Sequence, residues 1–416
     1  MSAALALVLA PPAPSPGDTA PVAPLPPYRT DRAAKPVAGA AAGDRGPLLP
    51  GPGTYTDVIA KGEKKFYRVH LDGVSNVFLS AVLAPPPGGT VGVVDGITLS
   101  LTTASGIACG GLNDLRFYGE SARPIADYVS RRIEAGRDCQ QPGDYLFAVE
   151  GVGREQDSVT ATRMPVELKY VVEPGLRNDA TPPPAPTGWS TTAPPLVSGP
   201  ARQVGGGTGF NDAPLLGDGG WRDTLRPGES RFYRVPLAWG QQLGVTARFA
   251  NSASPEGTVT ADGLRVALYN PARGAVEERK ALYTGRPTTV SLLTAPAAYA
   301  NRTQGSSGAV RAMRFQGAYY LQLTLDRRVP EAVPLELDVS VRGAPQPGPE
   351  YAGEADATVF GLATHGTDHR RSMLAVGIGG IGLGTALVLG LVAWSAASRR
   401  GMSTRPVSGP GTGPAA

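Results

Sequence analysis

The sequence predicts a mainly β protein, with two antiparallel, jelly-roll-like β-sandwich domains followed by one C-terminal transmembrane helix. Three observations support this fold class. A segment of about 120 residues occurs twice in similar form, its apolar residues alternate with the period of a β-strand, and one uncharged run near the C-terminus is long enough to cross a bilayer. The composition agrees, because only 18% of the residues are charged and 55 glycines and 41 prolines provide many turns.

The duplication is clearest where residues 54–71 (TYTDVIAKGEKKFYRVHL) align with residues 220–237 (GWRDTLRPGESRFYRVPL). Residues identical in the two segments occur in the same order and at a constant offset. In the first segment they are Asp57, Gly62, Glu63, Phe66, Tyr67, Arg68, Val69 and Leu71. Such agreement, which continues to the end of each copy, indicates two copies of one module.

The periodicity within each copy is that of β-strands. Residues 66–71 (FYRVHL) alternate between apolar and polar side chains, which places their apolar members on one face of an extended segment. Turn signals such as Pro142 followed by Gly143 separate these segments. Short alternating strands with this punctuation predict one antiparallel sandwich at residues 51–176 and another at residues 215–345.

The first copy has a feature that the second lacks. Residues 121–134 place apolar side chains at near-helical spacing, which predicts a short helix inserted into the first copy. Cys109 and Cys139, the two cysteines of the chain, bracket this segment. In an exported protein an even cysteine count favours one disulfide, which would fasten the insert, over a pair of buried free thiols.

The repeated motifs resemble a known bacterial module. An aromatic-rich strand (KKFYRV, SRFYRV) and a later glycine–tyrosine strand (PGDYLFAV, QGAYYLQL) look like the pre-peptidase C-terminal domain, a small jelly-roll-like sandwich. Tandem copies with a final membrane helix are similar to uncharacterised secreted and membrane-anchored proteins of actinobacteria. The resemblance implies an accessory or binding role rather than a reaction. The chain departs from the family in its larger copies and in having no attached peptidase.

The two ends of the chain predict its topology. Residues 373–394 carry no charge over a length that suits a membrane span, and Arg399 and Arg400 follow on the side expected to be cytoplasmic. Residues 2–10 resemble the apolar core of a signal peptide, although a disordered alanine-rich tail is the alternative. We therefore expect a single-pass protein of the cell membrane with its body outside and its C-terminus in the cytoplasm.

Segments rich in proline, alanine and glycine separate these parts, and proline-rich spacers are stiff and extended. The predicted order is a signal segment, complete or truncated, at 1–20, a disordered segment at 21–50, the first sandwich at 51–176, a linker at 177–214, the second sandwich at 215–345, a stalk at 346–372, the transmembrane helix at 373–396 and a cytoplasmic tail at 397–416.

The sequence predicts no catalytic, cofactor-binding or metal-ligating constellation. His365 and His369 have the spacing of metal ligands on a helix, but a solvated stalk is the better interpretation because glycine and threonine lie between them. Aspartates that recur in both copies could bind Ca²⁺ through their oxygens, although we favour a role in fixing turns. They are Asp57 and Asp95 in the first copy and Asp223 and Asp262 in the second.

These observations favour a non-enzymatic binding or scaffold protein that presents its sandwiches at the cell surface. The alternative is an accessory subunit of a membrane protease or secretion complex. Trp221 and Trp239 are candidate binding-face aromatics for a glycan or protein partner, and Gly380 with Gly384 forms a G-x-x-x-G face for a homodimer through the membrane helix. Basic residues are scattered among acidic ones, which argues against a nucleic-acid partner.

Overall fold

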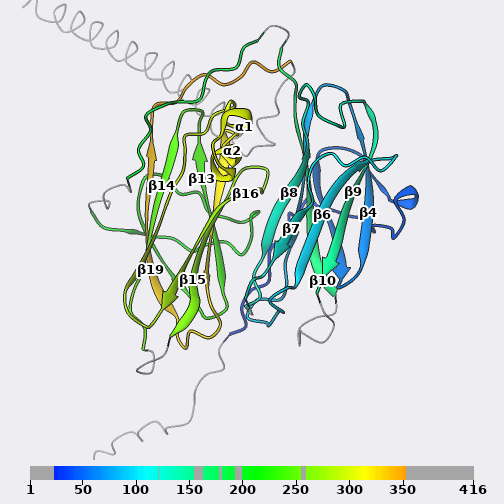
Figure 1. Cartoon of the computed structure of the whole chain (residues 1–416). Helices are drawn as coiled ribbons and strands as arrows, with labels where there is room; N and C mark the ends of the chain where they lie inside the picture. The colour runs from blue at the N-terminus through cyan, green and yellow to red at the C-terminus, as the bar shows by residue number, and fades with distance from the viewer. Residues whose placement is uncertain are drawn as a thin grey trace, which may run out of the picture.

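The computed structural model describes residues 23–119, 121–153, 163–177, 180–192, 199–253 and 259–352, which form two β-sandwiches side by side (Figure 1). The predicted fold class is confirmed for this part of the chain: it is mainly β, with four sheets that make two sandwiches. The predicted signal segment, the transmembrane helix with Gly380 and Gly384, and the cytoplasmic tail lie outside the described residues. Within the described residues, no helix is long and apolar enough to cross a membrane.

The first sandwich consists of the sheets β1-β3-β10-β5-β8 and β2-β4-β9-β6-β7. Its elements are β1 (Lys35–Pro36), η1 (Gly43–Arg45), β2 (Leu48–Leu49), β3 (Gly53–Ala60), β4 (Lys64–Leu71), β5 (Asn76–Leu83), β6 (Gly96–Thr103), β7 (Asn113–Arg116), β8 (Ile125–Arg131), β9 (Gly143–Val152) and β10 (Arg163–Glu173).

The second sandwich consists of the sheets β11-β12-β19-β14-β17 and β13-β18-β15-β16. Its elements are β11 (Arg202–Gln203), β12 (Gly219–Leu225), β13 (Ser230–Leu237), β14 (Gln242–Phe249), β15 (Thr260–Tyr269), β16 (Ala275–Tyr283), β17 (Thr288–Leu293), α1 (Asn301–Gln304), α2 (Gly308–Ala312), β18 (Gly317–Leu325) and β19 (Val333–Arg342).

The strand orders of the two sandwiches correspond except at β2, whose place in the second copy is taken by an isolated parallel bridge between Leu215 and Arg234. This correspondence confirms the duplication seen in the sequence. In each copy a two-residue strand, β1 or β11, pairs in parallel with the first long strand, β3 or β12. Isolated bridges recur as well, since Ala40 pairs with Phe66 and Gly207 pairs with Phe232. The two copies therefore share the arm that precedes each sandwich in addition to the sandwich itself.

Each sandwich has an apolar core between its two sheets. Tyr67, Val69 and Leu71 of β4 point into the first core, as the alternation of the sequence predicts, and the corresponding residues of β13 point into the second. Alternate residues of a strand point to opposite faces of the sheet. Burial of one such aliphatic or aromatic side chain contributes roughly 1.5–3 kcal/mol, so the cores account for much of the stability.

The predicted helix at residues 121–134 is wrong. These residues contain β8, which pairs antiparallel with β5 from Ile125 opposite Leu83 to Arg131 opposite Val77. The apolar positions that suggested a helix also fit a strand, and the tertiary pairing with β5 decides between the two. In the second copy β17 occupies the same place beside β14, so residues 121–134 are not an insert.

The predicted disorder of residues 21–50 is also wrong for the described part of that segment, which contains β1, η1 and β2. The recurring aspartates hold it in place. Asp57 accepts hydrogen bonds from the Gly39 amide and the Tyr67 hydroxyl, each at 2.8 Å. In the second copy Asp223 accepts the equivalent hydrogen bonds from the Gly206 amide and the Tyr233 hydroxyl, each at 2.7 Å. Both aspartates therefore fix the backbone of an arm to the sandwich that follows it.

Candidate functional site

The two sandwiches pack face to face instead of being held apart by a linker. The outer faces of β10, β5 and β8 lie against those of β13, β18 and β15, with apolar side chains such as Val82 and Ala267 between them. Phe210, from the segment predicted to be a linker, inserts here. Its ring lies 5.0–5.2 Å from the rings of Phe232, Tyr269 and Tyr320. The segment therefore connects the sandwiches, as expected of a linker, but its described end is packed, because it contains β11 and buries Phe210 between the domains.

A buried carboxylate, Glu167 of β10, is the centre of the polar part of this interface. It forms an ion pair with Arg273 of the second sandwich, and both side chains are at most 2% exposed. The Tyr28 hydroxyl donates to it at 3.0 Å, the Asp31 amide at 2.7 Å and the Asn211 side chain at 3.0 Å. Burial by itself would lower the pKa of Arg273, but the charge of Glu167 raises it above its usual value.

A second buried carboxylate, Glu173 at the end of β10, joins the sandwiches near α2. It lies 3.3 Å from the guanidinium of Arg314, and it accepts hydrogen bonds from the Asn76 side chain at 2.8 Å and the Tyr351 hydroxyl at 3.1 Å. The same arginine stacks 4.9 Å above the Phe78 ring. Two buried ion pairs thus cross the interface, together with the aromatic contacts, and they fix one sandwich relative to the other.

A pocket of about 250 Å³ opens at one end of this interface. Tyr118 and Ser121, between β7 and β8, form one side of it, and Asp262 in β15 and Asp326 after β18 form the other. The Ser121 hydroxyl donates to Asp326 at 2.8 Å and thereby joins the two sides. Neither sandwich makes this pocket alone, and ligand sites are common at such domain junctions.

Arginines dominate the buried part of the pocket wall. Arg123 and Arg265 are 5% and 6% exposed. Glu278 pairs with both of them, at 2.6 Å from Arg265 and 3.9 Å from Arg123, and Asp262 lies 3.5 Å from Arg265. Burial, followed by the charge of Arg265, lowers the pKa of Arg123 to about 10. The pocket therefore holds two buried cations whose partner carboxylates lie nearer the solvent.

Two exposed apolar residues lie at the mouth of the pocket, beside the exposed side chains of Asp262 and Arg328, and we call these two apolar residues the apolar rim. The apolar rim consists of Val93 and Tyr118, which line the pocket and are 52% and 60% exposed. The Tyr118 amide donates to the Val93 carbonyl at 3.1 Å, which holds the two loops of the first sandwich together.

Backbone strain is also found at this pocket. Tyr118 and Asp262 have φ angles of 48° and 52°, in the left-handed region that side chains other than glycine rarely adopt. Within the described residues only Cys139 and Arg273 share this property. Strained residues of this kind cluster at functional sites. The positive φ angles therefore indicate the same candidate site as the buried charges.

A second depression, of about 460 Å³, lies on the outer face of the sheet that contains β14 and β19. Its prominent polar feature is Arg248, which lies 2.8 Å from Glu336 and 3.1 Å from Asp338. It belongs to the second sandwich alone, and the charged residues that line it are half-buried or exposed, while Asp338 beneath them is 3% exposed. The pocket between the sandwiches is the stronger candidate site because buried charge, an apolar rim and strained backbone coincide there.

Trp221 and Trp239, the predicted binding-face aromatics, have structural roles. Trp239 is 6% exposed and lies beneath Gly348, where an added side chain would meet its indole at 2.3 Å. Trp221 packs against the core, and the Arg202 guanidinium stacks 3.8 Å from its ring. Neither tryptophan lines the two pockets described above, but Trp239 and Tyr299 line a third depression of only about 10 Å³. A binding role for the two tryptophans stays a prediction.

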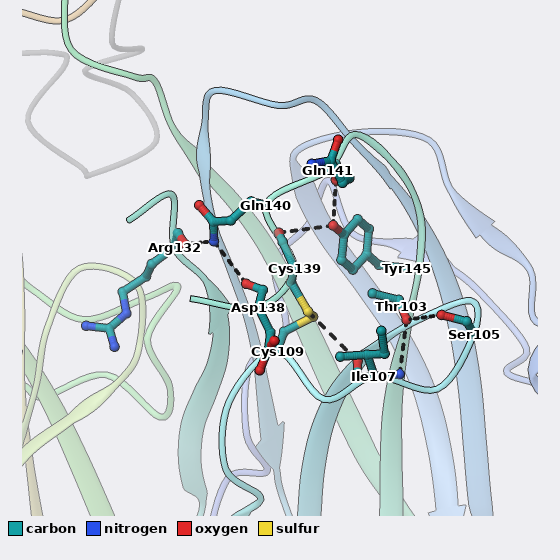
Figure 2. The surroundings of a disulfide bond; sticks show 10 residues. All are labelled: Thr103, Ser105, Ile107, Cys109, Arg132, Asp138, Cys139, Gln140, Gln141 and Tyr145. Carbon is teal, nitrogen blue, oxygen red and sulfur yellow. Dashed lines mark hydrogen bonds between the residues drawn. A yellow bond between two sulfur atoms is a disulfide. The ribbon is translucent and has the colours of Figure 1, made fainter. Parts of the chain in front are cut away.

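The predicted disulfide between Cys109 and Cys139 is confirmed. It joins the loop between β6 and β7 to the loop between β8 and β9 (Figure 2). The Tyr145 hydroxyl lies 3.0 Å from the Cys139 carbonyl and 2.5 Å from that of Gln141, either of which can accept its proton. Since residues 121–134 are not an insert, the bond fastens two loops at one end of the first sandwich.

The recurring acids of the sequence do not form a metal site. Within the described ranges, no three His, Cys, Asp or Glu side chains gather in a way that could hold a metal ion. Asp95 is fully buried, pairs with Lys61 at 2.6 Å and accepts a hydrogen bond from the Gly92 amide. Asp262, its counterpart, faces the pocket instead. His365 and His369 lie outside the described residues.

Apart from Asp262, which the sequence singles out as a recurring aspartate, sequence reasoning missed the residues of the pocket. Arg123, Arg265 and Glu278 belong to no local motif. Arg265 and Glu278 meet on the neighbouring strands β15 and β16, and Arg123 joins them through the packing of the two sandwiches. The one available signal was a charged side chain, Arg265, between apolar neighbours in a strand (GLRVALY). Such a position points away from the core of its own sandwich, which indicates a partner surface without saying what that surface is.

No protein-family model and no curated protein matches the chain, so the resemblance to the pre-peptidase C-terminal domain has no matching model behind it. Among solved structures, the tandem CBM22-1–CBM22-2 domain of Paenibacillus barcinonensis Xyn10C is 11% identical, with a TM-score of 0.18 over 70% of this chain and 92% of that one. The CUB1-EGF-CUB2 domain of human MASP-1/3 is 7% identical, with a TM-score of 0.16 over 68% and 99%. The ANX1 ectodomain of Arabidopsis thaliana is 9% identical, with a TM-score of 0.18 over 71% and 86%. These are distant similarities to β-sandwich domains, and they identify no family.

Proposed function

We propose that this chain is a membrane-anchored extracellular binding protein whose two sandwiches act together as one recognition body. The observation that supports this most is the buried interface, in which Glu167 and Glu173 each pair with an arginine of the other sandwich. A ligand that contacts both sandwiches then meets a surface already held in place, which lowers the entropic cost of binding. The paired charges around the pocket are not arranged as a nucleophile and its base, so we favour binding over catalysis.

The location of the protein is part of the proposal. A disulfide persists in oxidising compartments, which supports an extracellular body. The uncharged run at 373–396 supports a single membrane span, and within it Gly380 and Gly384 would allow two copies to associate. We expect the partner to be a protein, with cell-wall glycan as the other candidate, and not a nucleic acid.

In-cell crosslinking of the tagged full-length protein, followed by mass spectrometry, tests the proposal. We expect one specific partner to be captured by the wild type and by Glu150→Arg, which alters an exposed ion pair with Lys64. Glu167→Arg places two arginines together in the interface and should abolish the capture. Recovery of no specific partner would refute the binding role, and equal capture by Glu167→Arg would assign recognition to a single sandwich.

A further inference from the structure

The charges of the pocket are suited to an additional anion. Arg123 and Arg265 are more than nine-tenths buried, whereas the side chains of Glu278 and Asp262 are 35% and 44% exposed. Lys280 lies 3.4 Å from Asp262 and 3.7 Å from Glu278. Asp326 and Arg328 also line the pocket and pair with each other at 2.8 Å, so four cations stand against three carboxylates around it. Among the described residues, the charged groups around the pocket therefore leave one positive charge in excess. An anion in the pocket would offset the cost of burying the two guanidinium groups.

The size of the pocket limits what this anion can be. Its volume of about 250 Å³ is slightly below the range of roughly 300–1,000 Å³ typical of small-molecule sites. One amino-acid residue fits such a space, while a longer ligand must continue across the apolar rim. A peptide whose terminal carboxylate is preceded by apolar side chains would match the arginines inside the pocket and the apolar rim at its mouth. Capture of a carboxyl terminus is a recurring mode of peptide recognition.

We propose that the pocket between the sandwiches binds the carboxyl terminus of a polypeptide, with its terminal carboxylate on Arg123 and Arg265 and its preceding side chains on the apolar rim. Guanidinium groups bind carboxylates through two parallel hydrogen bonds, which gives direction as well as affinity. This site rests on the proposed function, because it names the kind of partner that the two-sandwich body recognises.

The probe is a library of N-acetylated tetrapeptides with apolar residues at the last two positions, prepared both as free acids and as C-terminal amides. Equilibrium dialysis against the full-length protein, read by mass spectrometry, should retain free acids. Their amides should bind roughly tenfold to a hundredfold more weakly, because a hydrogen-bonded charge is lost. Retention of the acids should fall as the salt concentration rises.

Two variants test whether the retained peptides occupy this pocket. Arg265→Gln removes one guanidinium and should lower the affinity by a similar factor, but it also breaks the pair with Glu278. Gly119→Phe avoids this problem, since a Cβ added there would lie 3.8 Å from Arg265, at an ordinary contact distance. The new ring should fill the pocket and abolish retention. Gly111→Phe, at an open position elsewhere in the first sandwich, is the matched control and should bind as the wild type does.

Each outcome decides the matter. Equal retention of acids and amides, or retention unchanged by Gly119→Phe, would overturn the assignment. If D-glucuronate is retained while none of the peptide acids is, the pocket takes an acidic glycan and the peptide proposal is refuted. If no acid is retained while in-cell crosslinking still recovers a partner, the pocket proposal fails and the proposed function stands. If no acid is retained and crosslinking recovers no partner, both the pocket proposal and the proposed function are refuted.

Discussion

The substitution Glu167→Gln tests whether the buried carboxylate holds the two sandwiches together. Glutamine keeps the shape of the side chain but removes its charge, so Arg273, whose side chain is 2% exposed, is left without a carboxylate in the interface. Removing one partner of a buried ion pair costs roughly 3–5 kcal/mol. That is a large fraction of the roughly 5–15 kcal/mol by which domains are usually stable. We therefore expect a clear loss of stability that begins at the interface.

Urea unfolding of the full-length protein measures this loss. In the wild type both sandwiches should unfold together in one transition. In Glu167→Gln an additional transition should occur at lower urea concentration, in which the sandwiches separate before their cores unfold. Glu150→Gln is the control, because its pair with Lys64 is 43–45% exposed and surface pairs contribute about 1 kcal/mol or less.

Removing both charges completes the test. The double variant Glu167→Gln/Arg273→Met leaves no unpaired charge in the interface, so it should recover part of the stability that Glu167→Gln loses. A Glu167→Gln protein within about 1 kcal/mol of the wild type would refute the reasoning, since that loss is typical of an exposed pair rather than a buried one.

Three further predictions concern the rest of the fold. Replacing Cys109 and Cys139 by serine opens a bond between residues 30 positions apart, and thermal unfolding should show a loss of about 3–4 kcal/mol. Gly206→Ala should release the second arm, detected as faster proteolysis, because the new Cβ would lie 2.8 Å from the Arg231 and Tyr233 side chains; Gly205→Ala, at an open position, should not. Burial, followed by the charge of Arg273, lowers the pKa of Lys169 to about 8. The unfolded chain therefore binds more protons than the folded one between about pH 8 and 10.5, so stability to urea should rise with pH across this window, and Lys169→Met should lose that rise.

The strands of both sandwiches could be predicted because their signals are local and occur twice. Alternation in FYRVHL and FYRVPL identifies the inward face of β4 and β13 without knowledge of the rest of the fold. The error at residues 121–134 has the opposite cause. Its apolar spacing fits a helix and a strand alike, and the antiparallel pairing of β8 with β5 decides the outcome.

The arms and the pocket could not be predicted, because they depend on contacts between distant parts of the chain. Composition alone made residues 21–50 look disordered, yet the hydrogen bond from Gly39 to Asp57 holds this segment on the first sandwich. The pocket needs Arg123 from one sandwich and Arg265 from the other. No feature of either sequence segment indicates that these two outward-facing arginines meet.

The arm that precedes the first sandwich also contacts the second, and this constrains the order of biogenesis. The Arg226 side chain donates to the Ala23 carbonyl across 203 positions of the chain, and the Tyr28 ring packs 6.4 Å from that of Phe232. In a chain made from its N-terminus, the arm emerges long before these partners do. The arm can therefore complete its contacts only after the second sandwich has been made, and such non-local contacts form slowly. Until then the newly made first half exposes its unpaired docking face, and it must be kept from associating with other chains.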